Sequence, residues 1–221
     1  MTQRFLCQAL LFDLDGVLAD TTALVEATWA EWAESRELDP GLAARVHGRP
    51  TAEIIDDVAP GLDPTEEARE IERSQEAQIP SVSPVEGAFA LVASLPTGSW
   101  AVVTSGTRAQ AAARLAAIGL EPPEVVITSE DVASGKPDPE PYLAAATRLG
   151  LAPEGCVVFE DAPAGIESGR AAGMTTVGLT TTMRADLLVA ADHVVASLRQ
   201  VRAELDGDRI AVSLDLVPSG G

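Results

Sequence analysis

Short, mostly apolar runs recur along the chain and predict the strands of a parallel β-sheet. They lie at residues 9–12, 100–103, 125–127, 156–159 and 175–179, and Val194-Val195 is typical of an edge strand. Runs of this length and character are typical of strands buried on both faces. Helical patterns lie between them at residues 107–118, 141–149 and 163–172, each followed by a glycine that can end a helix. This alternation predicts an α/β fold with a Rossmann-like parallel sheet.

Residues from about 20 to 84 break this alternation. Val25, Trp29 and Trp32 recur at the spacing of one helical face, so the stretch opens with an amphipathic helix. Two further helical patterns follow, at residues 51–58 and 64–78. Residues 79–84 are typical of a linker, because two prolines bracket the serines. We therefore predict a small helical domain inserted after the first strand of the sheet domain.

Polar residues follow four of the predicted strands, either directly or, for Lys136, in the loop after the strand at residues 125–127. In chain order they are Asp13, Asp15, Thr104, Ser105, Lys136, Glu160 and Asp161. The carboxyl ends of parallel strands meet at one edge of an open sheet, and ligands bind there. The sequence therefore predicts a single site that gathers four acids, two hydroxyls and a lysine.

The residue types at this edge favour phosphoryl transfer. Crowded carboxylates repel one another and raise one another's pKa unless a cation is near. Mg²⁺ takes oxygen ligands from one or two carboxylates and from a substrate phosphate. A hydroxyl and a lysine donate hydrogen bonds and positive charge to phosphate oxygens. With a free carboxylate as nucleophile, such a set suits transfer through an aspartyl-phosphate.

The composition excludes several other classes of protein. The 221 residues carry a net charge of −19, which repels nucleic acids and anionic membranes. The apolar stretch at the N-terminus ends at Asp13, too early for a signal peptide or a membrane span. Two cysteines, Cys7 and Cys156, suit a core better than a zinc site or a disulfide framework. We expect a cytoplasmic monomer with neither nucleic-acid nor membrane partners.

Four segments of the chain resemble, in order, the four motifs of the haloacid dehalogenase-like phosphatases. They are residues 12–18 (FDLDGVL), 103–106 (VTSG), 135–137 (GKP) and 159–165 (FEDAPAG). The resemblance spans about residues 9–197 and is nearest to the sugar-phosphate phosphatases related to β-phosphoglucomutase. It implies an α/β core domain of residues 1–18 and 85–221 and an α-helical cap domain of residues 19–84. It also implies a small phosphorylated sugar or polyol as substrate.

The resemblance implies catalytic roles for the residues of these motifs. Asp13 is then the nucleophile that attacks phosphorus. Asp15 is the general acid that protonates the leaving oxygen and later the base that activates water. Thr104 and Lys136 hold the phosphate oxygens, with the backbone N–H of Ser105 assisting.

The same resemblance implies a Mg²⁺ site. Asp161 ligates the ion together with Asp13 and the carbonyl of Asp15. Glu160 assists, either through water or through Lys136. Thr104 and Ser105 also admit a plainer reading, in which they only cap the next helix.

The insert offers two candidate substrate contacts, His47 and Arg49. They form a loop-like triplet with Gly48, and such a triplet is also common on a plain surface. A cap over the site must, however, bring positive charge to a sugar phosphate in so acidic a protein. We therefore expect His47 and Arg49 to contact the substrate.

Three other functions compete with a sugar phosphatase. The β-phosphoglucomutases carry a histidine ten residues after the second Asp of the first motif, where this chain has Val25, so a mutase is the less favoured alternative. A haloacid dehalogenase needs neither Asp15 nor a metal. A phospho-acceptor receiver module is about half this length and has two adjacent acids before its acceptor. The sequence therefore favours a Mg²⁺-dependent phosphatase.

Overall fold

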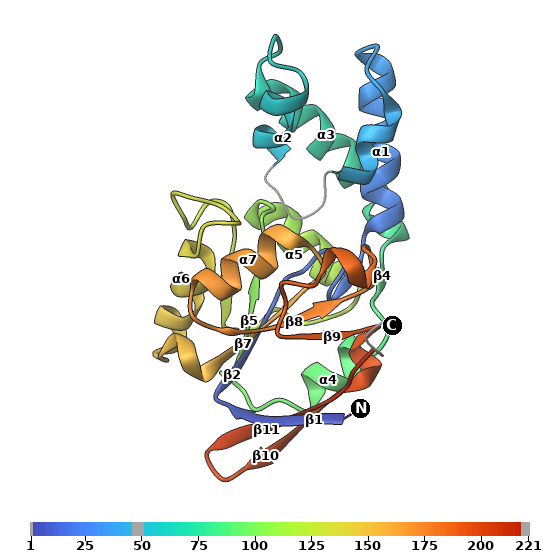
Figure 1. The fold of residues 1–221 in the computed structure, drawn as a ribbon. Coiled ribbons are helices and arrows are strands. Elements are labelled where there is room, and N and C mark those ends of the chain that lie inside the picture. The colour runs from blue at the N-terminus through green and yellow to red at the C-terminus, as the bar shows by residue number, and fades with distance from the viewer. Residues whose placement is uncertain (1, 46–50, 218–221) are drawn as a thin grey trace.

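The computed structural model describes residues 2–45 and 51–217, and its centre is a six-stranded sheet (Figure 1). The strand order is β6-β5-β2-β7-β8-β9, and all neighbours run parallel. The strands are β2 (Ala9–Phe12), β5 (Trp100–Val103), β6 (Val125–Ile127), β7 (Cys156–Glu160), β8 (Thr175–Leu179) and β9 (His193–Val195). Each lies within one residue of a strand predicted from the sequence, which confirms the predicted fold class.

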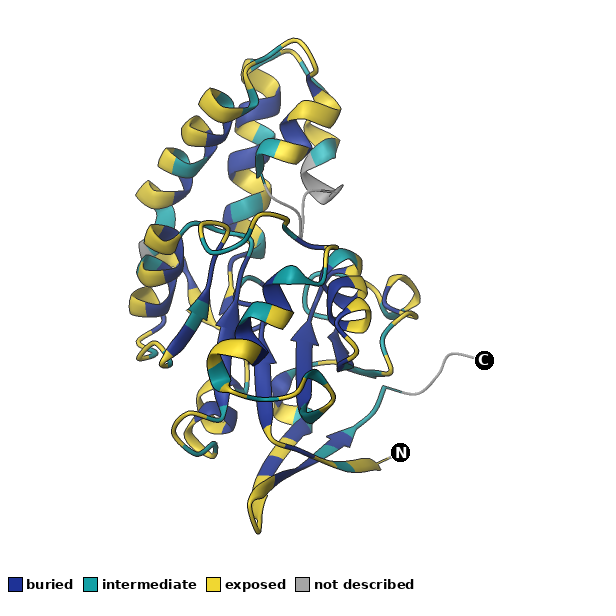
Figure 2. Ribbon diagram, turned by 90° about the vertical axis from the view of Figure 1, so that its left-hand side faces the viewer, coloured by how far each residue is buried: buried dark blue, intermediate teal, exposed yellow. Residues whose placement is uncertain are grey.

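Helices cover both faces of this sheet, so its strands are buried (Figure 2). The helices are α4 (Ala88–Ala93), α5 (Arg108–Ala117), α6 (Glu140–Leu149) and α7 (Pro163–Ala171), with 3₁₀ turns η3 (Pro153–Gly155), η4 (Ala185–Leu187) and η5 (Leu198–Gln200). Leu10 of β2 shares one hydrophobic cluster with Leu115 of α5, and Leu11 shares a second with Tyr142 of α6. Neighbouring strand residues point to opposite faces, so β2 needs an apolar residue at every position.

A second, three-stranded antiparallel sheet joins the two ends of the chain. It consists of β1 (Thr2–Cys7), β11 (Arg209–Asp215) and β10 (Val201–Asp206), in the order β1-β11-β10. Thr2 pairs with Asp215 across the sheet. Buried and exposed residues alternate over the first four residues of β10, Val201 to Glu204, and the rest of the strand is exposed. The sequence analysis did not predict this sheet: β1 is mostly exposed, and the short buried run Ile210–Val212 of β11 was overlooked.

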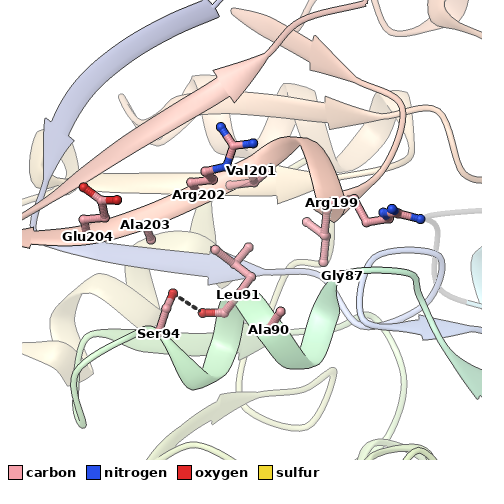
Figure 3. Close-up of a pocket in the computed structure, with 10 residues that line it drawn as sticks. Gly87, Ala90, Leu91, Ser94, Arg199, Val201, Arg202, Ala203 and Glu204 are labelled. Carbon is pink, nitrogen blue, oxygen red and sulfur yellow. Dashed lines mark hydrogen bonds between the residues drawn. The ribbon is translucent and has the colours of Figure 1, made fainter.

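Helix α4 packs beside this second sheet and forms a pocket with it (Figure 3). The pocket measures about 420 Å³ and is lined by Gly87, Ala90, Leu91, Ser94, Leu198, Arg199, Val201, Arg202, Ala203 and Glu204. Arg199 forms an ion pair with Glu86. Because β1 leads directly into β2, the second sheet lies at the amino end of β2, away from the edge where Asp13 follows that strand.

The helical insert stands beyond the carboxyl ends of the strands (Figure 1). It contains α1 (Thr22–Ser35), η1 (Pro40–Arg45), α2 (Thr51–Val58) and α3 (Pro64–Gln78). It has its own hydrophobic cluster, in which Trp29 and Trp32 pack edge to face with ring centroids 5.4 Å apart. The predicted linker is ordered as the turn η2 (Ile79–Ser81) and the strand β4 (Ser83–Pro84), which pairs with β3 (Ala19–Asp20).

The two cysteines are buried and unoxidised, as predicted for core residues. Burial raises the pKa of Cys7 to about 12 and that of Cys156 to about 11, so both thiols stay protonated. In the described ranges, no helix combines the length and the apolar character that a membrane crossing requires.

Candidate active site

Lys136 lies at the centre of a buried polar cluster at the carboxyl ends of β2, β5 and β7. Its Nζ donates hydrogen bonds to Asp13 Oδ1 at 2.6 Å, to Glu160 Oε1 at 2.6 Å and to the carbonyl of Val103 at 2.9 Å. Only 1% of the residue is exposed. It is also the only lysine in the sequence, since every other basic residue apart from histidine is an arginine. Three residues predicted from the sequence therefore meet at one ammonium group.

Tyr142 of α6 is a member of this cluster that the sequence analysis did not identify. Its hydroxyl donates to Glu160 Oε1 at 2.8 Å, and its ring centroid lies 5.2 Å from Lys136 Nζ. Burial, followed by the charges of Glu160 and Asp13, raises the pKa of Tyr142 well above its ordinary value, so the phenol stays a donor. A lone tyrosine in an apolar helical pattern offers no local sign of such a role.

The second oxygen of Glu160 faces the start of helix α7. Glu160 Oε2 accepts hydrogen bonds from the backbone N–H groups of Asp161 at 3.2 Å and Ala162 at 3.4 Å. A Cβ atom at Gly165 would overlap the Glu160 carboxylate. The glycine therefore lets the helix pack directly on a carboxylate that Lys136 and Tyr142 hold in place.

Replacing Gly165 by alanine is expected to displace Glu160 and weaken the site. Overpacking at a buried position costs roughly 1–3 kcal/mol, so the thermal midpoint should fall by about 2–12 °C. Thermal unfolding measures the stability, and release of phosphate, the activity expected from the sequence motifs, measures the effect on the site. Gly61→Ala is the matched control, because no atom lies within 4 Å of a Cβ there. Equal midpoints and activities for the two variants would contradict the prediction.

Asp161 is held by elements that the sequence analysis overlooked. The hydroxyl of Thr182, in the segment after β8, donates to Asp161 Oδ2, and Thr181 donates to the carbonyl of Gly16. Gly16 has a φ of +77°, and a Cβ there would overlap the Asp161 carboxylate. Both threonines come shortly after the predicted strand at residues 175–179, which ends at the same edge of the sheet. That position is the signal by which the sequence could have indicated them.

Three carboxylates crowd together at this place. Ligand oxygens of Asp13, Glu160 and Asp161 lie within 4.8 Å of one another, and all three residues are buried. Burial raises the pKa of Asp13 to about 7, and the charges of Glu160 and Asp15 add to the shift while Lys136 opposes it. Burial and the charges of Glu160 and Asp13 raise the pKa of Asp161 well above its ordinary range.

The charge balance of the cluster fits a divalent cation. Burial alone would lower the pKa of Lys136, but the carboxylates of Asp13 and Glu160 outweigh it, so the lysine stays charged. One ammonium against three carboxylates leaves two negative charges when all are ionised. Hard oxygen donors of this kind are the ligands that Mg²⁺ prefers. The donor set thus fits the metal predicted from the sequence.

Thr104 and Ser105, which directly follow β5, do not cap helix α5. Thr107 caps α5 instead, in a reciprocal capping box with Gln110. The hydroxyl of Thr104 accepts a hydrogen bond from the backbone N–H of Gly106 at 3.1 Å, so its proton remains able to donate. Ser105 lies next to it at the same edge, half-buried. The reading in which Thr104 and Ser105 merely cap the helix is therefore wrong.

Asp15 lies at the boundary between the sheet and the insert. The hydroxyl of Thr21 donates to Asp15 Oδ1 at 2.7 Å, and Arg114 Nη1 of α5 donates to Oδ2 at 2.7 Å. The sequence analysis did not identify Arg114, which reads as one polar position in an Ala-rich helix. The two predicted substrate contacts, His47 and Arg49, lie outside the described residues.

Comparisons with known proteins agree with the motifs. The sequence model of the family described as haloacid dehalogenase-like hydrolases matches residues 10–179. The chain is 38% identical to hexitol phosphatase A of Escherichia coli over 201 residues, which cover 88% of this chain and 93% of that one. It is 35% identical to 2-deoxyglucose-6-phosphate phosphatase 1 of Saccharomyces cerevisiae over 223 residues, covering 90% and 91%.

A solved structure supports the fold, although not the function. The β-phosphoglucomutase of Clostridium difficile superposes with a TM-score of 0.77 over 89% of this chain and 93% of that one. The two sequences are 23% identical. At that level the likeness concerns the arrangement of the chain and not its reaction.

Proposed function

The chain belongs to the haloacid dehalogenase-like hydrolase family, and from this premise we propose that it is a phosphoric monoester hydrolase acting on small sugar or polyol phosphates. The observation that carries the proposal is the cluster of Asp13, Lys136 and Asp161 at the carboxyl edge of the sheet. Relatives named as hexitol and 2-deoxyglucose-6-phosphate phosphatases support the substrate class.

Asp13 is the proposed nucleophile. One of its carboxylate oxygens forms a bond to phosphorus, and the bond from phosphorus to the sugar oxygen breaks. Lys136 lies 2.6 Å from the Asp13 carboxylate, so its charge acts beside the phosphoryl group in transfer. Thr104 and Ser105 border the same place and offer hydroxyl and backbone donors to the phosphate oxygens.

Asp15 is the proposed acid and base. It gives a proton to the sugar oxygen as that oxygen leaves. A water molecule then attacks the phosphorus of the aspartyl-phosphate, and Asp15 takes a proton from that water. Inorganic phosphate leaves, and Asp13 returns to its carboxylate form.

Asp13, Asp161 and the carbonyl of Asp15 would hold Mg²⁺, which supplies positive charge to the phosphoryl oxygens when bound. Glu160 takes an outer place in this proposal. Its two oxygens already accept hydrogen bonds from Lys136, Tyr142 and the backbone.

Mg²⁺ affinity is expected to fall as the pH is lowered from 7.5 to 5.5. Burial raises the pKa of Asp13 to about 7 in the absence of metal, so below that pH a proton competes with the ion. Displacement of one proton weakens binding by about tenfold per pH unit. Isothermal titration with MgCl₂ in two buffers of different ionisation enthalpy measures both the affinity and the protons released. An affinity independent of pH would refute the proposed ligand set, and Asp161→Asn is the control that should lose binding.

The helical insert, residues 19–84, is proposed as a cap over the site carried by residues 1–18 and 85–221. Its base is the β3–β4 ribbon, and its helices have a core of their own. His47 and Arg49 stay candidate contacts to the sugar. The expectations of a cytoplasmic monomer without nucleic-acid or membrane partners likewise stay predictions.

Val25 argues against the mutase alternative. It is half-buried and packs against both the hydrophobic cluster of the insert and that of the sheet. A valine there cannot relay protons, so the phosphoenzyme is open to hydrolysis.

Phosphate release from a panel of phosphate esters tests the proposed function. The panel contains mannitol 1-phosphate, 2-deoxyglucose 6-phosphate, fructose 1-phosphate, ribose 5-phosphate and glycerol 3-phosphate, each with Mg²⁺ and with EDTA. We expect release that depends on Mg²⁺ from one or a few of them. If no phosphate is released and β-glucose 1-phosphate is instead converted to glucose 6-phosphate, the mutase function would be supported and the phosphatase function refuted. Release undiminished by EDTA would remove the metal from the mechanism.

A further inference from the structure

Arg114 is a buried cation beside the site to which no role has been assigned. It lies on α5 and is 4% exposed. Its Nη1 donates to Asp15 Oδ2 at 2.7 Å, and its Nη2 donates to Gln75 Oε1 at 2.8 Å. Gln75 belongs to α3 of the insert and is 5% exposed. One guanidinium group therefore connects the proposed acid–base carboxylate to a helix of the insert.

The same guanidinium borders the hydroxyl-bearing segment after β5. A Cβ atom at Gly106 would lie 3.2 Å from Arg114 Nη1 and 3.5 Å from Thr104 Oγ1. The absence of a side chain at Gly106 therefore leaves room for the Arg114 guanidinium between residues 104–106 and the insert. Arg114 therefore lies beside Asp15, beside Gln75 of the insert and beside Gly106.

A guanidinium group transmits orientation well. It is planar and presents its N–H donors at fixed angles. If the oxygen of Gln75 moves, the plane of the guanidinium must turn or lose that bond. Either event changes the direction from which Asp15 is held.

Both oxygens of Asp15 depend on the position of the insert. Oδ2 is held by Arg114, and Oδ1 by the hydroxyl of Thr21, which immediately precedes helix α1. Helices α1 and α3 are themselves joined, because Gln75 Nε2 donates to the hydroxyl of Thr28 at 3.5 Å. A displacement of the insert therefore acts on the Asp15 carboxylate from two sides.

The burial of Arg114 and Gln75 makes the loss of their hydrogen bond costly. Buried polar groups are costly when they lose their partners. Arg114 and Gln75 satisfy each other only while α3 is seated on α5. The hydrogen bonds from Arg114 to Gln75 and Asp15 are therefore all present only when helix α3 packs against helix α5.

We propose that Arg114 is a positioning residue that couples the seating of helix α3, through Gln75, to the orientation of the Asp15 carboxylate. The inference rests on the proposed function, since it assigns Asp15 its acid–base role. It predicts that breaking the contact between Arg114 and Gln75 impairs proton transfer by Asp15.

The test compares two aryl phosphates that differ in leaving group. Phenol is the more basic leaving group, so phenyl phosphate needs a proton from Asp15 more than p-nitrophenyl phosphate does. The value of kcat/KM reports the steps up to departure of the phenol. Gln75→Leu and Arg114→Lys are expected to lower kcat/KM for phenyl phosphate about tenfold further than for p-nitrophenyl phosphate.

Arg36→Met is the matched control. Arg36 forms ion pairs with Glu67 and Glu70 that join α1 to α3, without contact to Asp15. Its loss perturbs the insert but should leave the ratio of the two kcat/KM values unchanged. Gln75→Leu is the primary variant, because it leaves the Arg114 guanidinium beside Asp15, whereas any substitution of Arg114 removes that guanidinium and can destabilise the chain. Thermal unfolding verifies that each variant is folded.

Three outcomes would overturn the inference. An unchanged ratio in folded Gln75→Leu and Arg114→Lys would reduce Arg114 to a packing role. An increase in kcat/KM for phenyl phosphate in these variants would mean that the contacts of Arg114 hinder proton transfer by Asp15. A wild-type protein inactive on both aryl phosphates and on the whole panel would refute the proposed function instead, and this inference with it.

Discussion

Replacing Asp13 by asparagine is expected to abolish phosphate release while the fold persists. The amide is nearly the same size as the carboxylate, but it cannot act as the nucleophile. The loss should be on the order of 10³-fold or more, because the proposed covalent path begins at this carboxylate. Steady-state phosphate release, with the mass of the intact protein checked, measures the loss. Residual activity above about one per cent would contradict the assignment, by the same criterion.

Stability gives an independent reading of the same variant. Burial raises the pKa of Asp13 to about 7, above its value in the unfolded chain. The folded state therefore binds more protons between those two pKa values, and it loses stability as the pH rises through that window. At pH 8 the charged Asp13 opposes folding, so Asp13→Asn should unfold at an equal or higher temperature than the wild type in the absence of metal. Asp20→Asn, at an exposed position nearby, is the control that should keep both activity and midpoint.

Replacing Lys136 by methionine is expected to have the second-largest effect. The variant removes the ammonium group that Asp13 and Glu160 share and leaves the three carboxylates crowded together. Breaking a buried ion pair costs about 3–5 kcal/mol, which lowers the thermal midpoint by roughly 6–20 °C. With that charge lost beside the transferring phosphoryl group, kcat should fall by about 10²–10³.

The control for Lys136 is a surface arginine. Arg148→Met removes an ion pair with Asp131 on a side chain that is 45% exposed, so we expect about 1 kcal/mol or less. Arg36 is not suitable here because it belongs to the insert. A Lys136→Met enzyme with raised KM and unchanged kcat would show that the lysine binds phosphate equally in the ground and transition states. That result would contradict its proposed place beside the nucleophile.

The predictable part of the site follows from one regularity. Parallel strands that are buried on both faces are continuous apolar runs, so β2, β5 and β7 are visible in the sequence. Residues directly after such runs lie at one edge of the sheet. Asp13 and Glu160 come directly after such runs, and Lys136 lies in the loop after β6. Their proximity was therefore predictable, although their distances were not.

The second sheet shows where this regularity ends. β1 is mostly exposed, whereas β11 contains the buried run Ile210–Val212. The two strands pair residues from opposite ends of the chain, Thr2 with Asp215. Nothing local in either segment indicates its partner.

The sequence by itself determined which segments form the parallel strands and which form the helices of the insert. It also determined which acids, hydroxyls and lysine come after the strands. Only the tertiary structure decided which further groups hold them: Tyr142 on Glu160, Thr182 on Asp161 and Arg114 on Asp15. Asp15 and Arg114 lie 99 residues apart in the chain. A buried polar group takes whichever partner packing brings within hydrogen-bond distance, and that choice leaves no periodic trace in the sequence.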